Sequence, residues 1–537
     1  MTGIRTFASL AAIGMCMTAL GTSIAHAEAL ATDQVLRRGN GAEPGGLDPA
    51  KTDDVQSTNV EIDLYEGLIT LDNSTKVAPG VAKSWTISPD GLTYTFKLRD
   101  DAKWSNGEKV TANDFVYSFE RTADPKTGSS YGFMYYPIKN GKEVVEGKLP
   151  PSALGVRAID PETFEIKLNS PAGYFLAALA HNVFLPVNKA NVEKFGDAFT
   201  HGGNLVSNGA FMLKEWTPQS RIVLVKNPNY WDAAKVKLKE VDYLPIENQN
   251  EDYKRYRAGD EDIVYEVSSD QVDQIRKDLP KEFKTFPWLG VYYLDFNMML
   301  PPLKDSQQLR QALSEVINRE ELVNKVVKTG ERPAYSYVPP GIPGYQSQML
   351  PFKGKSMAER IADAKKIFAK AGYTPDHPLK LQIIYNTSAN HKKIMIAIAA
   401  MWKQALGVNV DLVNQEWKVF LDTRKQKQVG QVYRDGWIAD YADPNTFLSE
   451  MLSTSGENNS GWKNADYDAA VNNAASATNP ATRAKFLEQA EAIMMKDQPV
   501  APLYDYVNKQ MVKPYVLGYH PNLIGYAYSK NISIAKH

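Results

Sequence analysis

The sequence predicts an α/β protein of more than one lobe, and three observations support that prediction. The chain has 537 residues, of which 43% are hydrophobic and 23% charged, a composition typical of globular proteins large enough for several cores. Strand-like segments are spread along the chain, and helical patterns alternate with them after about residue 290. No repeat, low-complexity block or flexible linker separates these parts. We therefore expect strands that cross between the lobes and form a hinge.

The charge balance excludes one large class of function. Lysine and arginine number 61, and aspartate and glutamate 62, which gives a formal net charge of −1. A general nucleic-acid binder, or a protein of anionic membrane surfaces, would carry a clear positive excess. The sequence therefore predicts no nucleic-acid partner.

Residues 1–27 have the pattern of a secretory signal peptide. One basic residue, Arg5, precedes an apolar stretch over residues 7–20, and the segment ends in Ala-His-Ala at residues 25–27. Small residues at this spacing are what signal peptidase recognises, so we predict cleavage after Ala27. No later stretch approaches 18 consecutive apolar residues, so we expect an exported and soluble mature chain.

The one cysteine of the chain, Cys16, lies inside this signal. A lipoprotein signal would also place a cysteine here, but Met15 stands where such signals need a small residue. If Cys16 leaves with the signal, the mature chain contains no cysteine. That excludes disulfides, cysteine proteases and thiolate metal sites, and the hydrophobic core alone must stabilise the exported chain.

Three segments of the first half have the pattern of strands. Residues 93–98 and 163–168 alternate apolar and polar side chains after proline-containing turns, and each predicts a half-buried strand. Residues 221–226 contain a continuous Ile-Val-Leu-Val run, which predicts a buried strand that ends at the Asn-Pro-Asn turn of residues 227–229.

Four segments of the second half have the periodicity of amphipathic helices. Ser356 and Glu359 form a capping box, and Gly372 is placed to end the helix that follows. Asn479 and Pro480 open another helix. The other two predicted helices run from the cap Asp305 to about Lys328, and from His391 to Leu406 with Gly407 and a strand at 408–412 after it.

No catalytic or metal motif stands out. Seven histidines are present, and none forms a pair at metal-ligand spacing. The spacing Gly-x-Ser-x-Gly occurs once, at residues 128–132, but no strand pattern precedes it, so it does not make a nucleophile elbow. The nearest approach to a phosphate loop, residues 141–148, has the wrong glycine spacing and is followed by Leu149 where Ser or Thr would hold magnesium. We therefore predict that the protein is not an enzyme, although a hydrolase with carboxylates far apart in sequence stays open.

A series of ordered sequence blocks resembles the peptide-importer solute-binding proteins of bacterial ABC transporters. Residues 434–441, Arg-Asp-Gly-Trp-Ile-Ala-Asp-Tyr, are similar to the oligopeptide- and murein-peptide-binding branch of that family. Together the blocks span nearly the whole mature chain. The others lie at residues 77–85, 101–107, 111–118, 227–231, 255–260, 310–313, 371–373 and 386–388 with His391.

The resemblance implies an α/β, two-lobed periplasmic binding protein fold of the large class II type, with a hinge between the lobes and an extra inserted domain. Lobe I is expected to be discontinuous, over residues 28–65, 190–291 and 510–537. The small inserted domain II is expected over residues 66–189. The ligand-clasping lobe III is expected over residues 292–509.

For function, the resemblance implies a periplasmic receptor that captures short peptides with a free N-terminal amine in a closed cleft. It would deliver them to an ABC permease complex in the inner membrane. A murein tripeptide receptor for cell-wall recycling or sensing is the alternative. We expect a monomer. Some relatives bind nickel or haem, but we expect neither a metal nor a cofactor here, because histidines are few and the aspartate that binds peptides, Asp440, is intact.

The resemblance also assigns residues to the ligand. Asp440 is expected to receive the α-ammonium group, because a desolvated, hydrogen-bonded charge pair is strong. Arg434 matches an arginine that stays near this aspartate in the closed site. Tyr131 and Trp437 match residues that line the ligand channel. Backbone pairing along an extended ligand is expected at Asp53 and Val55 on one edge, and at Gly436 and Ile438 on the other.

For the C-terminal carboxylate, Arg424 and His391 match basic residues of the relatives. A third position, a lysine in the relatives, aligns with Val327, and the lysine here is its neighbour Lys328. A shift of one position turns a helical side chain by about 100°. The preferred peptide length and the murein alternative therefore stay open.

Each assignment has a simpler structural alternative. Asp440 in an exposed loop would only cap a turn, and Arg434 on a surface would only pair within its own strand. Tyr131 and Trp437 are also typical of ordinary core aromatics. His391, near the start of a predicted helix, is also typical of a residue that faces water.

Overall fold

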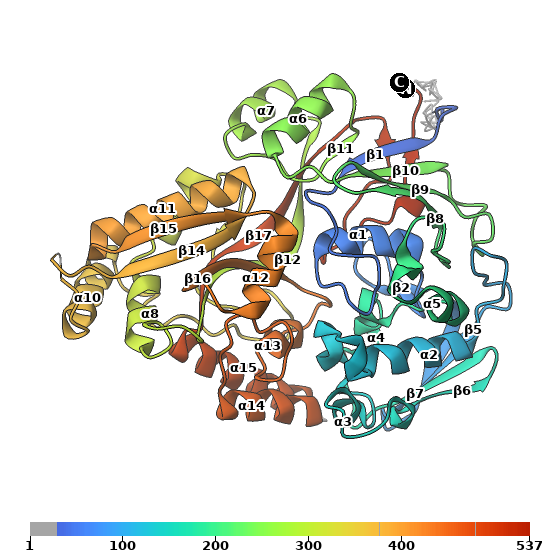
Figure 1. Cartoon of the computed structure of the whole chain (residues 1–537), viewed down its shortest axis with the longest axis horizontal. Coiled ribbons are helices and arrows are strands. Elements are labelled where there is room, and N and C mark those ends of the chain that lie inside the picture. Colours follow the sequence, from blue (N-terminus) through green and yellow to red (C-terminus); the bar gives the residue numbers. More distant parts are fainter. Residues whose placement is uncertain (1–28, 375, 478) are drawn as a thin grey trace, which may run out of the picture.

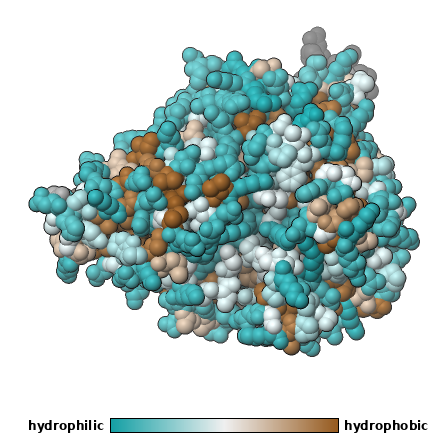
Figure 2. Space-filling view, viewed as in Figure 1, coloured by the Kyte–Doolittle hydropathy of each residue, from teal (hydrophilic) through white to brown (hydrophobic). Residues whose placement is uncertain are grey.

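The computed structural model describes residues 29–374, 376–477 and 479–537 (Figure 1). The predicted signal peptide lies outside the described residues. Within the described ranges, no helix combines the length and the apolarity needed to cross a membrane. Figure 2 shows a largely hydrophilic face, with apolar side chains gathered in one patch over the region of helix α11 (Ala389–Leu406) and strand β15 (Asn409–Gln415).

One mixed sheet of eleven strands runs through both halves of the molecule. The strand order is β15-β14-β16-β12-β17-β11-β1-β10-β9-β8, and β13 pairs with β17 outside this path. The buried strand predicted at residues 221–226 is confirmed as β9. The strands are β1 Val35–Gly39, β8 Phe211–Thr217, β9 Arg221–Lys226, β10 Glu240–Leu244, β11 Ile263–Val264, β12 Phe283–Phe296, β13 Arg332–Pro333, β14 Lys380–Asn386, β15 Asn409–Gln415, β16 Val432–Ile438 and β17 Val500–Val512.

Two long strands, β12 and β17, join the halves of this sheet. They pair with each other in antiparallel fashion, with a shift of register between Pro287 and Val291. β17 also pairs with β11 on one side of the molecule, and β12 pairs with β16 on the other. In Figure 1 the pair lies between the two halves, which confirms the predicted crossing strands. The expected domain boundaries near residues 291 and 509 fall inside these strands and remain predictions.

A separate four-stranded antiparallel sheet lies within residues 66–189, in the order β4-β5-β7-β6. Helix α2 packs on it through Phe115 and Phe119, whose rings lie 5.7 and 5.3 Å from that of Phe164 on β7. Both strands that alternation predicts in this region are confirmed, as β5 and β7. The elements are β4 Ala82–Ile87, β5 Thr93–Leu98, β6 Val156–Asp160, β7 Thr163–Lys167 and α2 Ala112–Ala123, with two-stranded ribbons of β2 Ile69–Leu71 with β3 Val77–Pro79 and of β18 Val516–Leu517 with β19 Ser533–Ile534 elsewhere.

Three of the four helices predicted in the second half are confirmed. Helix α10 (Met357–Lys370) begins at its predicted capping box, and α15 (Pro480–Asp497) has Asn479 as its cap. Helix α11 ends at Gly407, which takes the left-handed conformation before β15. The remaining helices of the chain are α1 Val55–Leu64, α3 Gly141–Val145, α4 Phe175–Ala178, α5 Lys189–Phe195, α6 Gln249–Ala258, α7 Val272–Asp278, α12 Trp417–Gln426, α13 Asn445–Glu450, α14 Ala465–Ser476, and the pieces α8 and α9 described next.

The single helix predicted over residues 305–328 is wrong. Helix α8 covers Gln307–Glu315, helix α9 covers Arg319–Glu321, and a π-helix follows over Leu322–Val327. Lys328 then takes the left-handed conformation, with a φ of 61°. The segment is therefore interrupted between Glu315 and Arg319 and changes to a π-helix at Leu322, where the sequence pattern predicts one continuous α-helix.

The break between α8 and α9 has a physical cause in Arg319. Its guanidinium is buried, and Nη1 donates to the carbonyl oxygens of Ser314 and Ile317 at 2.9 and 3.3 Å, groups that a continuous helix would satisfy internally. The Asn318 side chain accepts from the backbone N–H of Glu321 and caps the second helix. These contacts depend on tertiary burial, which local periodicity does not report.

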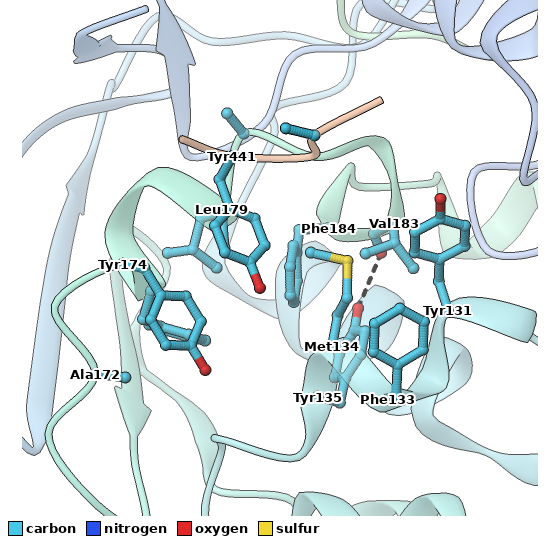
Figure 3. Packing of buried hydrophobic residues seen from close by; sticks show 14 of the residues in the cluster. Tyr131, Phe133, Met134, Tyr135, Ala172, Tyr174, Leu179, Val183, Phe184 and Tyr441 are labelled. Carbon is cyan, nitrogen blue, oxygen red and sulfur yellow. Dashed lines mark hydrogen bonds between the residues drawn. The ribbon is translucent and has the colours of Figure 1, made fainter. Parts of the chain in front are cut away.

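A hydrophobic cluster joins the expected inserted domain to the expected lobe III. Figure 3 shows Tyr441 of the second part lying close to Tyr174 of the first, and the two rings are 5.1 Å apart and nearly parallel, at 9°. The guanidinium of Arg483 lies 4.8 Å from the Tyr174 ring and donates to Asp443. The two parts therefore pack directly against each other.

Candidate functional site

A cavity of about 220 Å³, here called the main cavity, is the candidate site, and its lining residues come from all three expected domains. Another cavity has about 20 Å³ and holds no more than a water molecule. Every predicted site residue except Lys328 lines the main cavity. The walls come from the start of α1, the segment around Tyr131, strand β16 with the residues after it, and β17.

Strand β16 forms one wall and leaves part of one edge open. It pairs with β12 over its whole length, but β14 pairs with it only at Val432 and Tyr433. The backbone of residues 434–438 therefore has no strand on that edge among the described residues. Gly436 leaves room for Tyr506, because a Cβ on Gly436 would lie 2.3 Å from the Tyr506 hydroxyl oxygen.

Asp440 lines the main cavity and is only 6% exposed. His181 Nε2 lies 3.2 Å from one carboxylate oxygen, and the Thr446 hydroxyl donates to the other at 2.7 Å. No lysine or arginine among the described residues forms an ion pair with it. A buried carboxylate without a cationic partner is costly to the protein, and a cationic ligand group would relieve that cost.

An aromatic stack borders Asp440. The ring of Tyr131 lies 4.6 Å from that of His181 and 6.0 Å from that of Trp437, at interplanar angles of 27° and 18°. Figure 3 shows Tyr131 beside Phe133, at the margin of the hydrophobic cluster. Burial raises the pKa of Tyr131 well above its ordinary value, so its hydroxyl is neutral. Tyr131 and Trp437 are thus both core aromatics and lining residues of the main cavity.

Arg434 lines the same cavity and is held by neutral groups. Its Nη1 donates to the Asn386 side chain at 3.3 Å and its Nη2 to the Tyr506 hydroxyl at 3.0 Å, while the guanidinium lies 4.8 Å from the Tyr292 ring. Its Nε is buried without a partner, and no carboxylate of the described residues forms an ion pair with it. Arg434 is therefore the cationic counterpart of Asp440.

Arg424 differs, because its charge is already paired. Nη1 donates to both carboxylate oxygens of Asp435, at 2.6 and 2.8 Å, and both side chains are buried. Burial, together with Asp435, raises the pKa of the neighbouring Asp295 well above its ordinary value. The described geometry shows Arg424 as part of a closed ion pair that borders the main cavity.

His391 is buried rather than facing water, so that structural alternative is wrong. Its Nδ1 lies 3.2 Å from the Tyr292 hydroxyl. Burial, with the charges of Arg434 and Lys509 nearby, lowers the pKa of His391 well below its ordinary value. The imidazole is neutral in this arrangement and can offer hydrogen bonds, whereas the resemblance assigns it as a basic group.

Lys328 lies outside the main cavity, so its predicted ligand role stays a prediction without support from the geometry. Its ammonium lies 3.5 Å from Asp273, its side chain is 42% exposed, and it does not line the main cavity. Lys328 directly follows the π-helix, in the left-handed conformation that ends it. A lysine that sequence reasoning missed, Lys509 on β17, lines the cavity but is paired with Glu331 at 2.6 Å and with Glu266 at 3.3 Å.

The edge opposite β16 is formed by the residues before α1. Asp53 accepts from the Ser130 hydroxyl at 3.2 Å and pairs with Lys425. The ion pair joins the expected lobe I to the expected lobe III. Val55 opens α1, and Asp54 caps that helix. The extended backbone on this edge therefore ends at Asp54, and an added strand would pair with the residues that precede the helix.

His181 is the main site residue that the sequence did not reveal. It lies in a short segment without any motif and approaches Asp440 only through the tertiary fold. Among the described residues, no group of three or more His, Cys, Asp or Glu side chains is arranged to hold a metal ion. The lining of the main cavity is thus a set of buried charges, amides, histidines and aromatic rings.

These features agree with the comparison to known proteins. Residues 76–459 match the family described as "Bacterial extracellular solute-binding proteins, family 5 Middle", and the chain belongs to this family of solute-binding proteins. The periplasmic oligopeptide-binding protein OppA of Escherichia coli (strain K12) is 42% identical to it over 532 residues, covering 98% of this chain and 97% of that protein.

Solved structures confirm the predicted two-lobed α/β fold. The murein tripeptide binding protein MppA of Escherichia coli superimposes with a TM-score of 0.92 at 42% identity, covering 95% of this chain and 100% of that one. The complex of Haemophilus influenzae OppA with the peptide RPPGFSPFR gives a TM-score of 0.91 at 38% identity, covering 94% of this chain and 100% of that one.

A further comparison shows which arrangement of the lobes is present. The unliganded open form of MppA gives a TM-score of only 0.64 over 95% of this chain and 99% of that one, at 41% identity. The chain therefore resembles the peptide complex far more than the open form, and we call its arrangement closed.

Proposed function

We propose that this chain is a periplasmic, non-enzymatic receptor that captures short peptides with a free N-terminal amine in the main cavity. The observation that supports this most is a pair of charges on one wall without a lysine, arginine or carboxylate partner, the buried Asp440 and the half-buried Arg434. A peptide has one ammonium and one carboxylate, so it neutralises both charges at once.

The spacing of the two charges suits a short peptide. Extended chain rises about 3.3 Å per residue, so the Cα atoms of Arg434 and Asp440 lie at most about 20 Å apart. We propose that Asp440 receives the ammonium and that Arg434 receives the carboxylate. Arg424 then acts indirectly, because its guanidinium is occupied by Asp435.

The open edge of β16 supplies the rest of the recognition. An extended ligand beside residues 434–438 would exchange backbone hydrogen bonds with them, a mode that does not depend on the ligand's side chains. Two charge pairs and several such bonds are sufficient for micromolar affinity, which corresponds to about −8 kcal/mol. Ligand side chains would lie in hydrated pockets, where bridging waters accept varied groups.

Closure completes the proposed cycle. Peptide binding would stabilise the closed arrangement about the crossing strands β12 and β17, with residues 292–509 moving against the rest of the chain. The closed, monomeric receptor would then be recognised by an ABC permease complex in the inner membrane. The periplasmic relatives and the predicted signal peptide support this location.

A murein tripeptide is the second candidate ligand. The likeness to MppA supports it, and so does the position of Lys328 outside the main cavity, which removes one of the cations expected for the C-terminal carboxylate of an ordinary peptide. At its far end a murein tripeptide offers diaminopimelate instead of an ordinary residue.

Mass spectrometry of small molecules released by denaturing the natively purified protein tests the proposal. We expect mixed peptides of two to five residues with free amines. A single species containing diaminopimelate would establish the murein candidate instead, and the absence of any peptide would contradict both. Prolonged incubation with a bound peptide should return it uncut, whereas cleavage would contradict a receptor without catalysis.

A further inference from the structure

The two ring nitrogens of His181 have different partners. Nδ1 lies 3.2 Å from the backbone nitrogen of Val183, and Nε2 lies 3.2 Å from a carboxylate oxygen of Asp440. A backbone N–H can only donate, so Nδ1 must accept and carries no proton. The proton of the neutral imidazole is therefore on Nε2 and is donated to Asp440.

Among the described residues, Asp440 is the carboxylate within ion-pair distance of His181. Tyr131 stacks on its ring, the neighbouring Asn182 donates to Glu61 of α1 at 2.7 Å, and Tyr526 lines the same wall. Burial raises the pKa of Glu61 to about 8, and it raises the pKa values of Tyr131 and Tyr526 well above their ordinary range. At neutral pH these groups are uncharged, and Asp440 is the charge that His181 meets.

A neutral donor has a specific effect on Asp440. Together with the Thr446 hydroxyl, it fixes the orientation of the carboxylate and leaves the negative charge uncompensated. A lysine or arginine in the same place would cancel that charge before the ligand arrives.

We propose that His181 is a positioning residue that keeps Asp440 available to the peptide ammonium, and that protonation of His181 opposes peptide binding. The inference rests on the proposed function and adds a proton-dependent control to the same site. A protonated ring needs a proton on Nδ1, where it would oppose the Val183 N–H, and the cation would pair with Asp440 and repel the ammonium.

The sign of the pH dependence follows from this competition. Binding favours the neutral ring, so a proton on His181 weakens peptide binding and affinity rises with pH. By linkage, peptide binding releases the proton that a charged ring carries. The ligand's own amine loses its proton only near pH 8, which lowers affinity as pH rises and so cannot imitate the effect.

Two substitutions separate the two nitrogens. In His181→Gln the amide nitrogen replaces the donor to Asp440 and cannot titrate. In His181→Asn the shorter side chain keeps an acceptor for the Val183 N–H, as a good cap residue does, but loses the donor to Asp440.

The experiment is calorimetric titration with trialanine at pH 7.5 and pH 5.5, with thermal unfolding of each variant as the folding control. We expect wild type to bind at least about threefold more weakly at pH 5.5. His181→Gln should lose this dependence, and His181→Asn should bind about threefold to tenfold more weakly than His181→Gln at pH 7.5. A His181→Gln variant that keeps the wild-type pH dependence would overturn the inference.

If the variants unfold, a measurement on wild type can still contradict the inference. Titrations at pH 5.5 in buffers of different ionisation enthalpy should show net proton release on binding, and no release would overturn the inference. Failure of wild type to bind any free-amine peptide at pH 7.5 would instead overturn the proposed function. Tight binding with no pH dependence overturns only the role of His181.

Discussion

Two aspartates of the segment 434–441 have opposite electrostatic environments. Asp435 accepts two close hydrogen bonds from the guanidinium of Arg424, and the pair is buried. The Asp440 carboxylate is also buried but meets only His181 and Thr446. The same contrast separates Arg424 from Arg434, which is held by an amide, one tyrosine hydroxyl and a tyrosine ring.

The difference teaches how a single wall serves both stability and binding. A buried ion pair that is closed within the protein strongly resists the loss of either partner, because the remaining charge is stranded. A buried charge that is held by neutral donors costs stability, and that cost is recovered when a ligand brings the opposite charge. Closed pairs are therefore structural, and we propose that open charges mark where the ligand binds.

The largest expected effect is on stability and breaks the closed pair. Arg424→Met should lower the free energy of unfolding by about 3–5 kcal/mol, because Asp435 is left buried beside Asp295 without a cation. Arg434→Met is the matched control and should cost less than about 1 kcal/mol, since no carboxylate depends on it. Chemical denaturation of both variants measures this, and equal losses would refute the contrast.

The next effect is on affinity and uses the open cation. Arg434→Met should weaken trialanine binding by at least about thirtyfold, because the peptide carboxylate loses its partner in a desolvated site. The C-terminal amide of trialanine carries no such charge, and the variant should bind acid and amide about equally. A variant that still prefers the acid as strongly as wild type would move the carboxylate away from Arg434.

Much of the fold could be predicted because its signals are local. Alternation identified β5 and β7, and the capping box of α10 depends on residues next to each other in the chain. The break after α8 could not be predicted, since it depends on where the guanidinium of Arg319 is buried.

The site divides in the same way. Family resemblance found Asp440, Arg434 and the open edge of β16, which lie together in one short segment. It could not show that Arg424 is already paired or that burial keeps His391 neutral, because both depend on neighbours distant in sequence. The approach of His181 to Asp440 is likewise visible only in three dimensions.

A smaller effect is expected from a contact outside the main cavity, between the expected inserted domain and the expected lobe III. Arg483 donates to Asp443 and lies over the Tyr174 ring, beside the stack of Tyr174 on Tyr441. Arg483→Met should weaken trialanine binding by about twofold to fivefold, because closure loses the cation–π contact between Arg483 and Tyr174. Small-angle scattering should show a larger open fraction, and unchanged affinity would mean that this contact does not stabilise closure.

The smallest effect is expected at the lysine outside the site. Lys328→Met removes an exposed ion pair with Asp273 and should change trialanine affinity by less than about twofold. The free energy of unfolding should change by less than about 1 kcal/mol. A tenfold loss of affinity would show that this lysine reaches the ligand after all.

The most direct test of the account measures the preference for a free amine in wild type and in Asp440→Asn. Titration of each protein with trialanine and with N-acetyl-trialanine at pH 7.5 gives four affinities and one coupling energy. Wild type should prefer the free amine by at least about thirtyfold, and Asp440→Asn should reduce that preference to within about threefold. A preference that survives intact in Asp440→Asn would contradict the claim that this open carboxylate binds the peptide ammonium.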